Sequence, residues 1–273
     1  MIQQKVEIRF QKSEAVRFIS HHDLMRAMMR AVRRAGLPVR LTEGFNPRPR
    51  IVFPVALELG VASLDEVAEI EFNQWLDTQE VSRRLACVLP PGLVLKEVRE
   101  MPALRAGRIP DRIHYLLHLQ EAEIQIPPMA IQTLLQATTL PYQRQREKRL
   151  QSVDLRPALL ALNLVTQPQQ QLQPGQPPQA ELLPDLELEV RPSQSGSARP
   201  LEVLSLLTGM PLEDLRRVRV TKTRMDLCFP PGTPTHPEQA LNPDTFQNLD
   251  TPASLDPLET PTEAAPILAD CQE

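Results

Sequence analysis

Cysteines, aromatic residues and glycines are all scarce in this chain of 273 residues. Its three cysteines, Cys87, Cys228 and Cys271, are too few and too far apart for a disulfide framework or a zinc site. No apolar run approaches the roughly 18 residues of a membrane-spanning helix, and the opening MIQQKVEIRFQ is too polar for a signal peptide. We therefore expect a soluble cytoplasmic protein with free thiols and no membrane partner.

Proline, in contrast, is abundant. The 29 prolines among 273 residues are about twice the average usage. Residues 165–184 contain seven Gln and five Pro, which predicts a long extended insertion inside a domain. Residues 229–273 contain nine prolines and few apolar side chains, which predicts a disordered C-terminal tail.

The predicted tail is also acidic. It contains eight acidic residues and no Lys or Arg, so the formal net charge of −4 divides into −8 on the tail and +4 on residues 1–228. Such a segment is typical of a solubilising extension. The alternative is a weak mimic of nucleic acid that folds back on the basic body of the protein.

The N-terminal half, residues 1–100, shows alternating apolar patterns interrupted by two helical ones. In the first strand, Glu7 and Arg9 are expected on the outer face. The order strand, helix, strand, strand, helix, strand is typical of a ferredoxin-like (split βαβ) fold. The expected strands are residues 5–10 (continued or paired by 15–19), 39–41 with 50–59, 67–72 and 93–98, and the expected helices are residues 21–35 and 78–89.

The C-terminal half, residues 111–228, follows a boundary near residues 101–111 and contains the insertion. It has a similar alternation of strand and helix signals, although no residue-level repeat relates it to the first half. We therefore expect an α+β protein made of two ferredoxin-like halves. The expected strands are residues 113–119, 186–191 and 218–227, with a mostly extended segment at 142–164 and helices at 128–137 and 200–208.

The first predicted helix has two contrasting faces. Ser20 is a good N-cap, and Gly36 followed by Pro38 marks the C-terminal end. At 100° per residue the apolar side chains fall on one arc, and arginines occupy the opposite side. The outer residues are Arg26, Arg30, Arg33 and Arg34.

His21, His22 and Asp23 lie at the start of this helix, where backbone N–H groups and the helix dipole favour an anion. A neutral histidine can also accept or deliver a proton near pH 7. Equally, Asp23 can be a capping residue and one histidine can pack against the strand–helix corner. His21 and Asp23 are therefore candidates for catalysis or ligand contact, with a purely structural role as the alternative.

The loop GFNPRP, residues 44–49, is a second candidate site. Gly44 permits a positive φ, and the two prolines make the loop rigid. Phe45 and Asn46 are predicted to position a nucleotide, and Arg48 and Arg50 to contact phosphates. The alternative is an irregular connection whose Phe45 fills the core.

Positive charge extends beyond these motifs. Residues 1–60 hold 11 Lys or Arg against five acids, and a second basic cluster contains Arg144 and Arg149, with Arg156 nearby. Concentrated basic charge attracts nucleic-acid phosphates, although such runs are often only a solvated face. With few aromatics for stacking, recognition of the shape or backbone of structured RNA is favoured over base-by-base reading.

Two motifs, FISHHDLM (residues 18–25) and RRAGLPVRLTEGFNPRPRIVF (residues 33–53), resemble the radical SAM-linked conserved bacterial family. VDLRP, ARPLEVLSLL and LEDLRRVRVTKTRM resemble its later landmarks, so the similarity covers about residues 4–227. Three positions depart from the family pattern: His22 replaces a usual Leu, Arg48 a usual His and Thr42 a usual Ser. The family is a domain of unknown function that is fused to radical SAM proteins or encoded beside them.

The resemblance implies a radical SAM protein as partner. This chain has no CxxxCxxC motif, so S-adenosylmethionine and the iron–sulfur cluster are expected on that partner only. No metal is expected here either, because His114 and His118 lie on a separate strand with no carboxylate cluster at ligand spacing.

Three functions remain open from the sequence. We expect an accessory module without its own reaction that binds structured RNA, such as tRNA or rRNA, for modification. One alternative is an enzyme in which His21 is the base and Asp23 orients it, acting on a nucleotide or phosphorylated substrate. The other is a pure protein-interaction scaffold.

Overall fold

The structure, a computed structural model, describes residues 4–102, 107–146, 149–166, 183–192 and 197–230. In these residues the chain has a mixed α+β fold with one large mixed sheet, which confirms the predicted class. Most of the insertion predicted at 165–184 and nearly all of the tail predicted at 229–273 lie outside the described residues.

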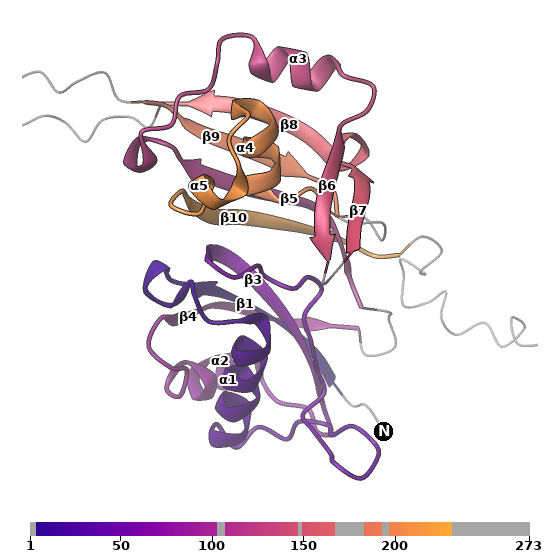
Figure 1. Ribbon diagram of the computed structural model, residues 1–273. Helices are drawn as coiled ribbons and strands as arrows, with labels where there is room; N and C mark the ends of the chain where they lie inside the picture. The colour runs from indigo at the N-terminus through magenta and orange to yellow at the C-terminus, as the bar shows by residue number, and fades with distance from the viewer. Residues whose placement is uncertain (1–3, 103–106, 147–148, 167–182, 193–196, 231–273) are drawn as a thin grey trace, which may run out of the picture. The chain divides into compact units, whose positions relative to one another are not determined.

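The N-terminal half has its strands and helices in the predicted order (Figure 1). β1 lies between β4 and β3, β2 pairs with the C-terminal part of β3, and every one of these pairings is antiparallel. The elements are β1 (Gln4–Lys12), α1 (His21–Arg34), β2 (Ile51–Val52), β3 (Val61–Phe72), α2 (Thr78–Ala86) and β4 (Leu93–Met101).

Two segments of this half differ from the predicted pattern. Residues 15–19 form no strand, because Glu14–Val16 is a short 3₁₀ turn that leads the chain from β1 into α1. The strand expected at 50–59 is limited to β2, since the chain then leaves the sheet. There Phe53 packs against the core of the N-terminal half and Leu57 is buried in the core of the C-terminal half, so a single period-2 pattern does not describe the segment.

Helices α1 and α2 pack against one face of this part of the sheet. Both contribute apolar side chains to a core in which each fully buried aliphatic or aromatic side chain stabilises the fold by about 1.5–3 kcal/mol. The members from the helices are Leu24, Met28, Ala31, Val32, Val81 and Leu85, and those from β1 and β3 include Val6, Ile8, Phe10, Ala68, Ile70 and Phe72.

The C-terminal half continues the same sheet in the order β10-β5-β9-β8, again with antiparallel pairing. A separate two-stranded sheet, β6–β7, precedes β8. The elements are β5 (Ile109–His118), α3 (Ala130–Gln136), β6 (Pro141–Arg146), β7 (Arg149–Asp154), β8 (Leu159–Val165), β9 (Asp185–Val190), α4 (Pro200–Thr208), α5 (Leu212–Leu215) and β10 (Arg219–Cys228).

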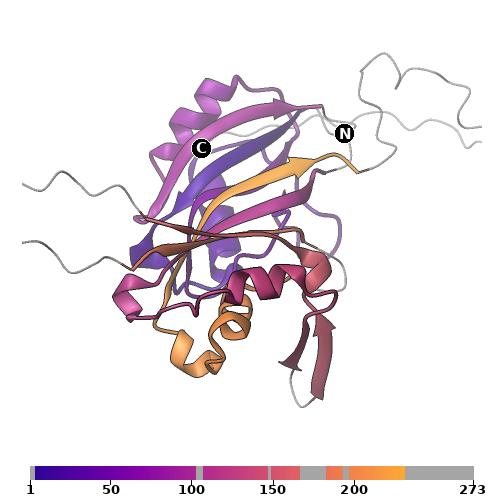
Figure 2. The same cartoon turned by 90° about the horizontal axis from the view of Figure 1, so that it is seen from above.

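The two halves meet where β10 pairs with β3 in parallel, with Val220 opposite Val61 and Lys222 opposite Ser63. Figure 2 shows β10, in orange, running within the sheet beside strands of both halves. A parallel pair needs a long crossover connection, and here the chain from α2 to α5 provides it. The pattern of two separate halves did not predict this pairing.

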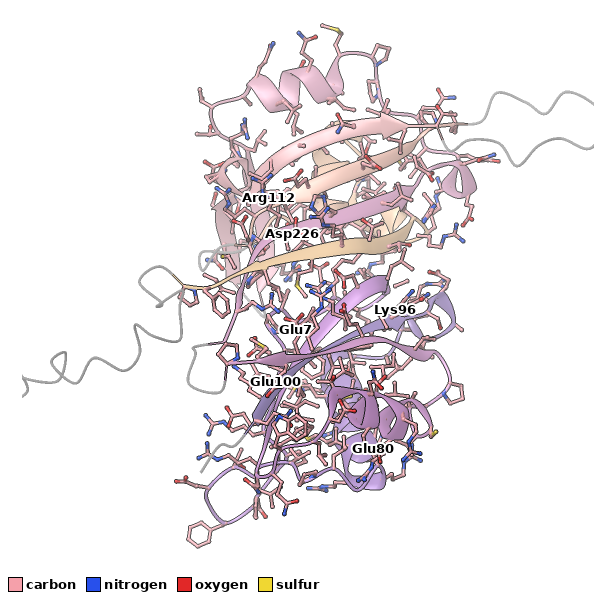
Figure 3. All side chains as sticks on the ribbon, turned by 180° about the vertical axis from the view of Figure 1, so that it is seen from behind. Glu7, Glu80, Lys96, Glu100, Arg112 and Asp226 are labelled. Carbon is pink, nitrogen blue, oxygen red and sulfur yellow. The ribbon has the colours of Figure 1, made fainter. Side chains whose placement is uncertain are left out.

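The side of β1 that was expected to face outward is covered. Glu7 (labelled in Figure 3) and Glu69 lie opposite each other on β1 and β3, and both are buried. Lys5 pairs with Glu69 at 2.6 Å, and the Arg108 guanidinium pairs with Glu7. The expectation for Glu7 was therefore wrong, because the segment leading into β5 lays Arg108 across this face of the sheet.

Candidate functional site

Local contacts determine where α1 begins and ends. The Ser20 hydroxyl oxygen accepts the backbone N–H of Asp23 at 3.1 Å, as predicted for an N-cap. At the other end Ala35 is the last capping residue, and Gly36 has a φ of 62°, the left-handed conformation that ends many helices. Between these ends the apolar face packs against the sheet and buries Leu24, Met28, Ala31 and Val32.

The outer face of α1 carries exposed arginines with few acidic partners. Arg26 approaches the Asp23 carboxylate at 3.5 Å, a loose contact between two exposed side chains. The Arg34 guanidinium donates to the backbone oxygen of Val88. Arg30 and Arg33 have no ion pair with any residue that the structure describes. Guanidinium groups without carboxylate partners are available to an anionic ligand.

His21 lies at the corner between the two faces. Its ring packs edge-to-face against Phe53, with ring centroids 5.4 Å apart, and its Nδ1 atom is buried without a hydrogen-bond partner in the described structure. Burial lowers the pKa of His21, and the neighbouring His22 lowers it further, whereas Glu66 acts in the opposite direction. Burial therefore favours the neutral form of the imidazole.

Asp23 does not orient this imidazole. Its carboxylate accepts a hydrogen bond from the Ser20 hydroxyl at 2.8 Å and faces Arg26. Among the contacts of the described residues, no hydrogen bond joins Asp23 to His21. This geometry assigns Asp23 to the helix cap, so an acid–base pair of His21 and Asp23 is not assembled here.

The loop that contains GFNPRP is held at its base. The Thr42 N–H donates to the backbone oxygen of Arg48 at 2.8 Å, and the Arg48 N–H donates to the Thr42 hydroxyl at 3.0 Å. Gly44 has a φ of 119°, as the turn requires. Phe45 at the tip is fully exposed, so it does not fill the core. Asn46 and Arg48 are exposed as well.

Arg50, at the end of the same loop, is less available than Arg48. Its guanidinium pairs with Glu71 at 3.1 Å, and Arg40 approaches the same carboxylate at 3.3 Å. Glu71 thus lies between two arginines at the edge of the sheet, and Arg40 also approaches Glu43 at 3.6 Å, so both arginines have acidic partners.

The predicted basic cluster of the C-terminal half is arranged differently. The Arg144 side chain is largely buried, pairs with Glu202 at 2.6 Å and also donates to the backbone oxygen of Ser197. The Arg156 guanidinium donates to three backbone oxygens, at Ala137, Leu159 and Leu135, over 2.9–3.0 Å. The side chain of Arg149 lies outside the described part of the structure.

A buried charged cluster at the junction of the halves was not predicted. Lys222 and Glu66 form an ion pair in which each side chain is 1% exposed. Lys12 donates to the backbone oxygens of Arg17, Ile19 and Val61. Burial lowers its pKa to about 8; Glu66 raises this pKa and Lys222 lowers it, both by less than burial does.

The sequence did contain a signal for this cluster. Lys12 continues the inward positions 6, 8 and 10 of the first strand, and Lys222 continues the inward positions 218 and 220 of the last. A lysine at an inward-facing position predicts a buried partner. Because Lys12 anchors the segment that leads to His21, its role is to hold the start of α1 against β3.

Neither a metal-binding cluster nor a membrane-spanning helix is found in the part of the chain that the structure describes. No group of three or more His, Cys, Asp or Glu side chains there is placed to hold a metal ion. The helices in those same residues are all too short or too polar to cross a membrane.

The fold and this site define a mixed α+β protein with one arginine-rich helix face and one exposed loop that is closed at its base by two hydrogen bonds. A comparison with protein families adds that the chain belongs to DUF2344, described as an uncharacterized protein conserved in bacteria, with residues 5–194 matched. A comparison with curated proteins gives no match.

Proposed function

We propose that this protein is an accessory module that binds structured RNA, such as tRNA or rRNA, and presents it to a separate radical SAM protein. The observation that carries the proposal is the outer face of α1, where Arg30 and Arg33 project without an ion pair in the described structure. Phosphate groups are suited to such guanidinium groups, and their attraction falls as salt rises.

The rigid loop supports the same function. Phe45 is fully exposed at its tip, and Arg48 projects nearby without an ion pair among the described residues. Exposing a phenylalanine on a loop fixed at its base gives no gain in stability, whereas a base can stack on its ring. The loop follows α1 in the chain after only a few residues, so both features belong to the N-terminal half.

The ferredoxin-like interpretation of the two halves belongs with this proposal. In each half the first strand lies between the fourth and the third, and the second pairs with the third: β4-β1-β3-β2 and β10-β5-β9-β8. This order supports a duplication of the split βαβ unit. We further propose the link to a radical SAM partner, which the motif resemblance supports.

The test compares two double variants that each remove two positive charges from the full chain. Arg30→Gln/Arg33→Gln alters the unpaired arginines of α1. The control, Arg83→Gln/Arg99→Gln, alters exposed arginines that pair with Glu80 and Glu97. We expect the first variant to bind bacterial tRNA about tenfold more weakly than the control at low salt.

Equal affinities of the two variants would contradict the proposed interface. If even the unaltered chain binds RNA no better than a neutral protein does, the RNA-binding proposal fails and the protein-interaction scaffold replaces it. The partner is tested separately: the chain should recover a radical SAM protein, and RNase-sensitive RNA with it, from a bacterial lysate. Recovery of the protein without such RNA would contradict the RNA part of the proposal.

A further inference from the structure

A groove runs along α1 beside the turn that follows α2. It is lined by Ala27, Arg30, Arg33, Arg34 and Pro90, and it encloses about 380 Å³. Past Arg34 and Pro90 it continues into a second hollow, of about 320 Å³, along residues 87–91. Figure 1 shows α1 and α2 side by side on the same face of the sheet. The first hollow alone has the volume of a small-ligand site.

The surface inside the first hollow is almost entirely carbon, although three arginines line it. Ala27, Arg30 and Arg34 are three and four residues apart, so they form one row along the helix. The aliphatic parts of the arginine side chains lie along the row and leave the charged groups at the rim. The pyrrolidine ring of Pro90 forms the opposite wall.

The charge at the rim is positive and largely unopposed. Arg30 and Arg33 have no ion pair among the described residues, and the Arg34 guanidinium is held at the turn by the backbone oxygen of Val88. The acidic residue of α2, Glu80, pairs with Arg83 and Arg84 at 2.6–2.7 Å.

An apolar floor with a cationic rim discriminates between forms of RNA. A duplex buries its bases and presents only phosphates to this groove, so no base covers the apolar floor. An unpaired nucleotide offers a flat base for the floor and a phosphate for the rim. We propose that this groove binds one unpaired nucleotide of an RNA loop or end, with the base against Ala27 and Pro90 and the phosphate at Arg30 and Arg33. The inference rests on the proposed function and narrows it to RNA with unpaired nucleotides.

The first experiment measures binding of AMP, ribose 5-phosphate and inorganic phosphate to the full chain by calorimetry. We expect AMP to bind at least about tenfold more tightly than ribose 5-phosphate, since only AMP can cover the apolar floor. Ala27→Met, which narrows the groove and keeps a good helix-forming residue, should remove that difference and leave ribose 5-phosphate binding unchanged.

The second experiment compares a stem–loop RNA with a blunt duplex of equal length. We expect the unaltered chain to favour the stem–loop and Ala27→Met to bind both equally. Equal binding of AMP and ribose 5-phosphate, with equal binding of both RNAs, overturns the groove inference and leaves the proposed function in place. AMP selectivity without any RNA binding supports the groove and contradicts the proposed function. A glutamate-rich peptide that binds as tightly as AMP overturns the nucleotide assignment.

Discussion

The arginines of α1 and those of the C-terminal half differ in what their guanidinium groups contact. Arg30 and Arg33 have no ion pair in the described structure, whereas Arg144 pairs with Glu202 and Arg156 donates to three backbone oxygens. Both sets form basic clusters in the sequence. The difference shows that a run of positive charge indicates a binding surface only after the internal partners of each residue are known.

The contrast follows from the surroundings of each residue. α1 turns one face to the core, and the arginines on its opposite face project away from the protein. Arg144 lies on a strand that packs beside α4, and its charge is neutralised by the buried Glu202 of that helix. Arg156 begins a short 3₁₀ turn, and its guanidinium donates to backbone oxygens at the C-terminal end of α3 and to that of Leu159.

The largest effect on stability is expected at Arg144. Arg144→Ala leaves the carboxylate of Glu202 buried without its closest cation, which costs about 3 kcal/mol of unfolding free energy. Arg30→Ala should change that free energy by less than about 0.5 kcal/mol. Urea unfolding of both variants measures the difference. Arg144→Met/Glu202→Leu should recover much of the loss, and equal stability of the two single variants would contradict the contrast.

A smaller effect on stability, which depends on pH, is expected at Lys12. This lysine is buried, and its ammonium group donates to backbone oxygens. Burial lowers its pKa to about 8 in the folded chain, from about 10.4 in an unfolded one. Between these values the unfolded chain holds more protons, so this lysine makes stability rise with pH, by at most about 1.4 kcal/mol per pH unit. The measurement is the free energy of unfolding from pH 7 to 10, with Lys12→Met as reference. A difference between the two chains that stays constant over this range would exclude the lowered pKa.

The α1 arginines should affect salt dependence more than stability. Each phosphate contact that is lost reduces the steepness with which log affinity for RNA falls against log salt concentration, by about 0.7–0.9. For Arg30→Gln/Arg33→Gln we expect a slope smaller by about 1.5, with an unchanged unfolding transition. Arg156→Gln should have the opposite effects: an altered unfolding transition and an unchanged salt dependence of RNA affinity. Filter binding from 50 to 300 mM salt gives both slopes.

The smallest effect is expected from removal of residues 234–273. Their composition, rich in proline and acidic residues and poor in large apolar side chains, predicts little contribution to a packed core. The thermal midpoint of the shortened chain should lie within about 2 °C of that of the full chain. A loss of several degrees in calorimetry would show that this composition is a poor guide.

Helix α1 was predictable because its determinants are local. The cap at Ser20, the arc of apolar residues and the glycine at position 36 all lie within 17 residues. The exposed tip at Phe45 was one of two open alternatives, since local turn residues define the shape of a loop but not what packs on it. Arg144 is buried because it pairs with Glu202, which lies 58 residues away in the sequence. A periodic sequence pattern cannot predict a contact between residues so far apart.

The sheet could be predicted in part for the same reason. Antiparallel neighbours within each half follow from the order of elements, but the β3–β10 pair depends on segments about 160 residues apart. The buried Glu7 likewise depends on Arg108, 101 residues further along the chain in the segment that leads into β5. Long-range contacts of this kind are decided by the packing of the whole chain.

The parallel pairing of β10 with β3 has a consequence for synthesis on the ribosome. All strands of the first half are present once residue 101 has emerged, so that half can form its core early. Glu66 is by then in place beside Lys12, but Lys222 arrives only with the last strand. Until then β3 has an open edge and the second half lacks the strand between β5 and β3. The final strand therefore completes both halves in one step, and a ribosome that stalls before residue 219 would leave both unfinished.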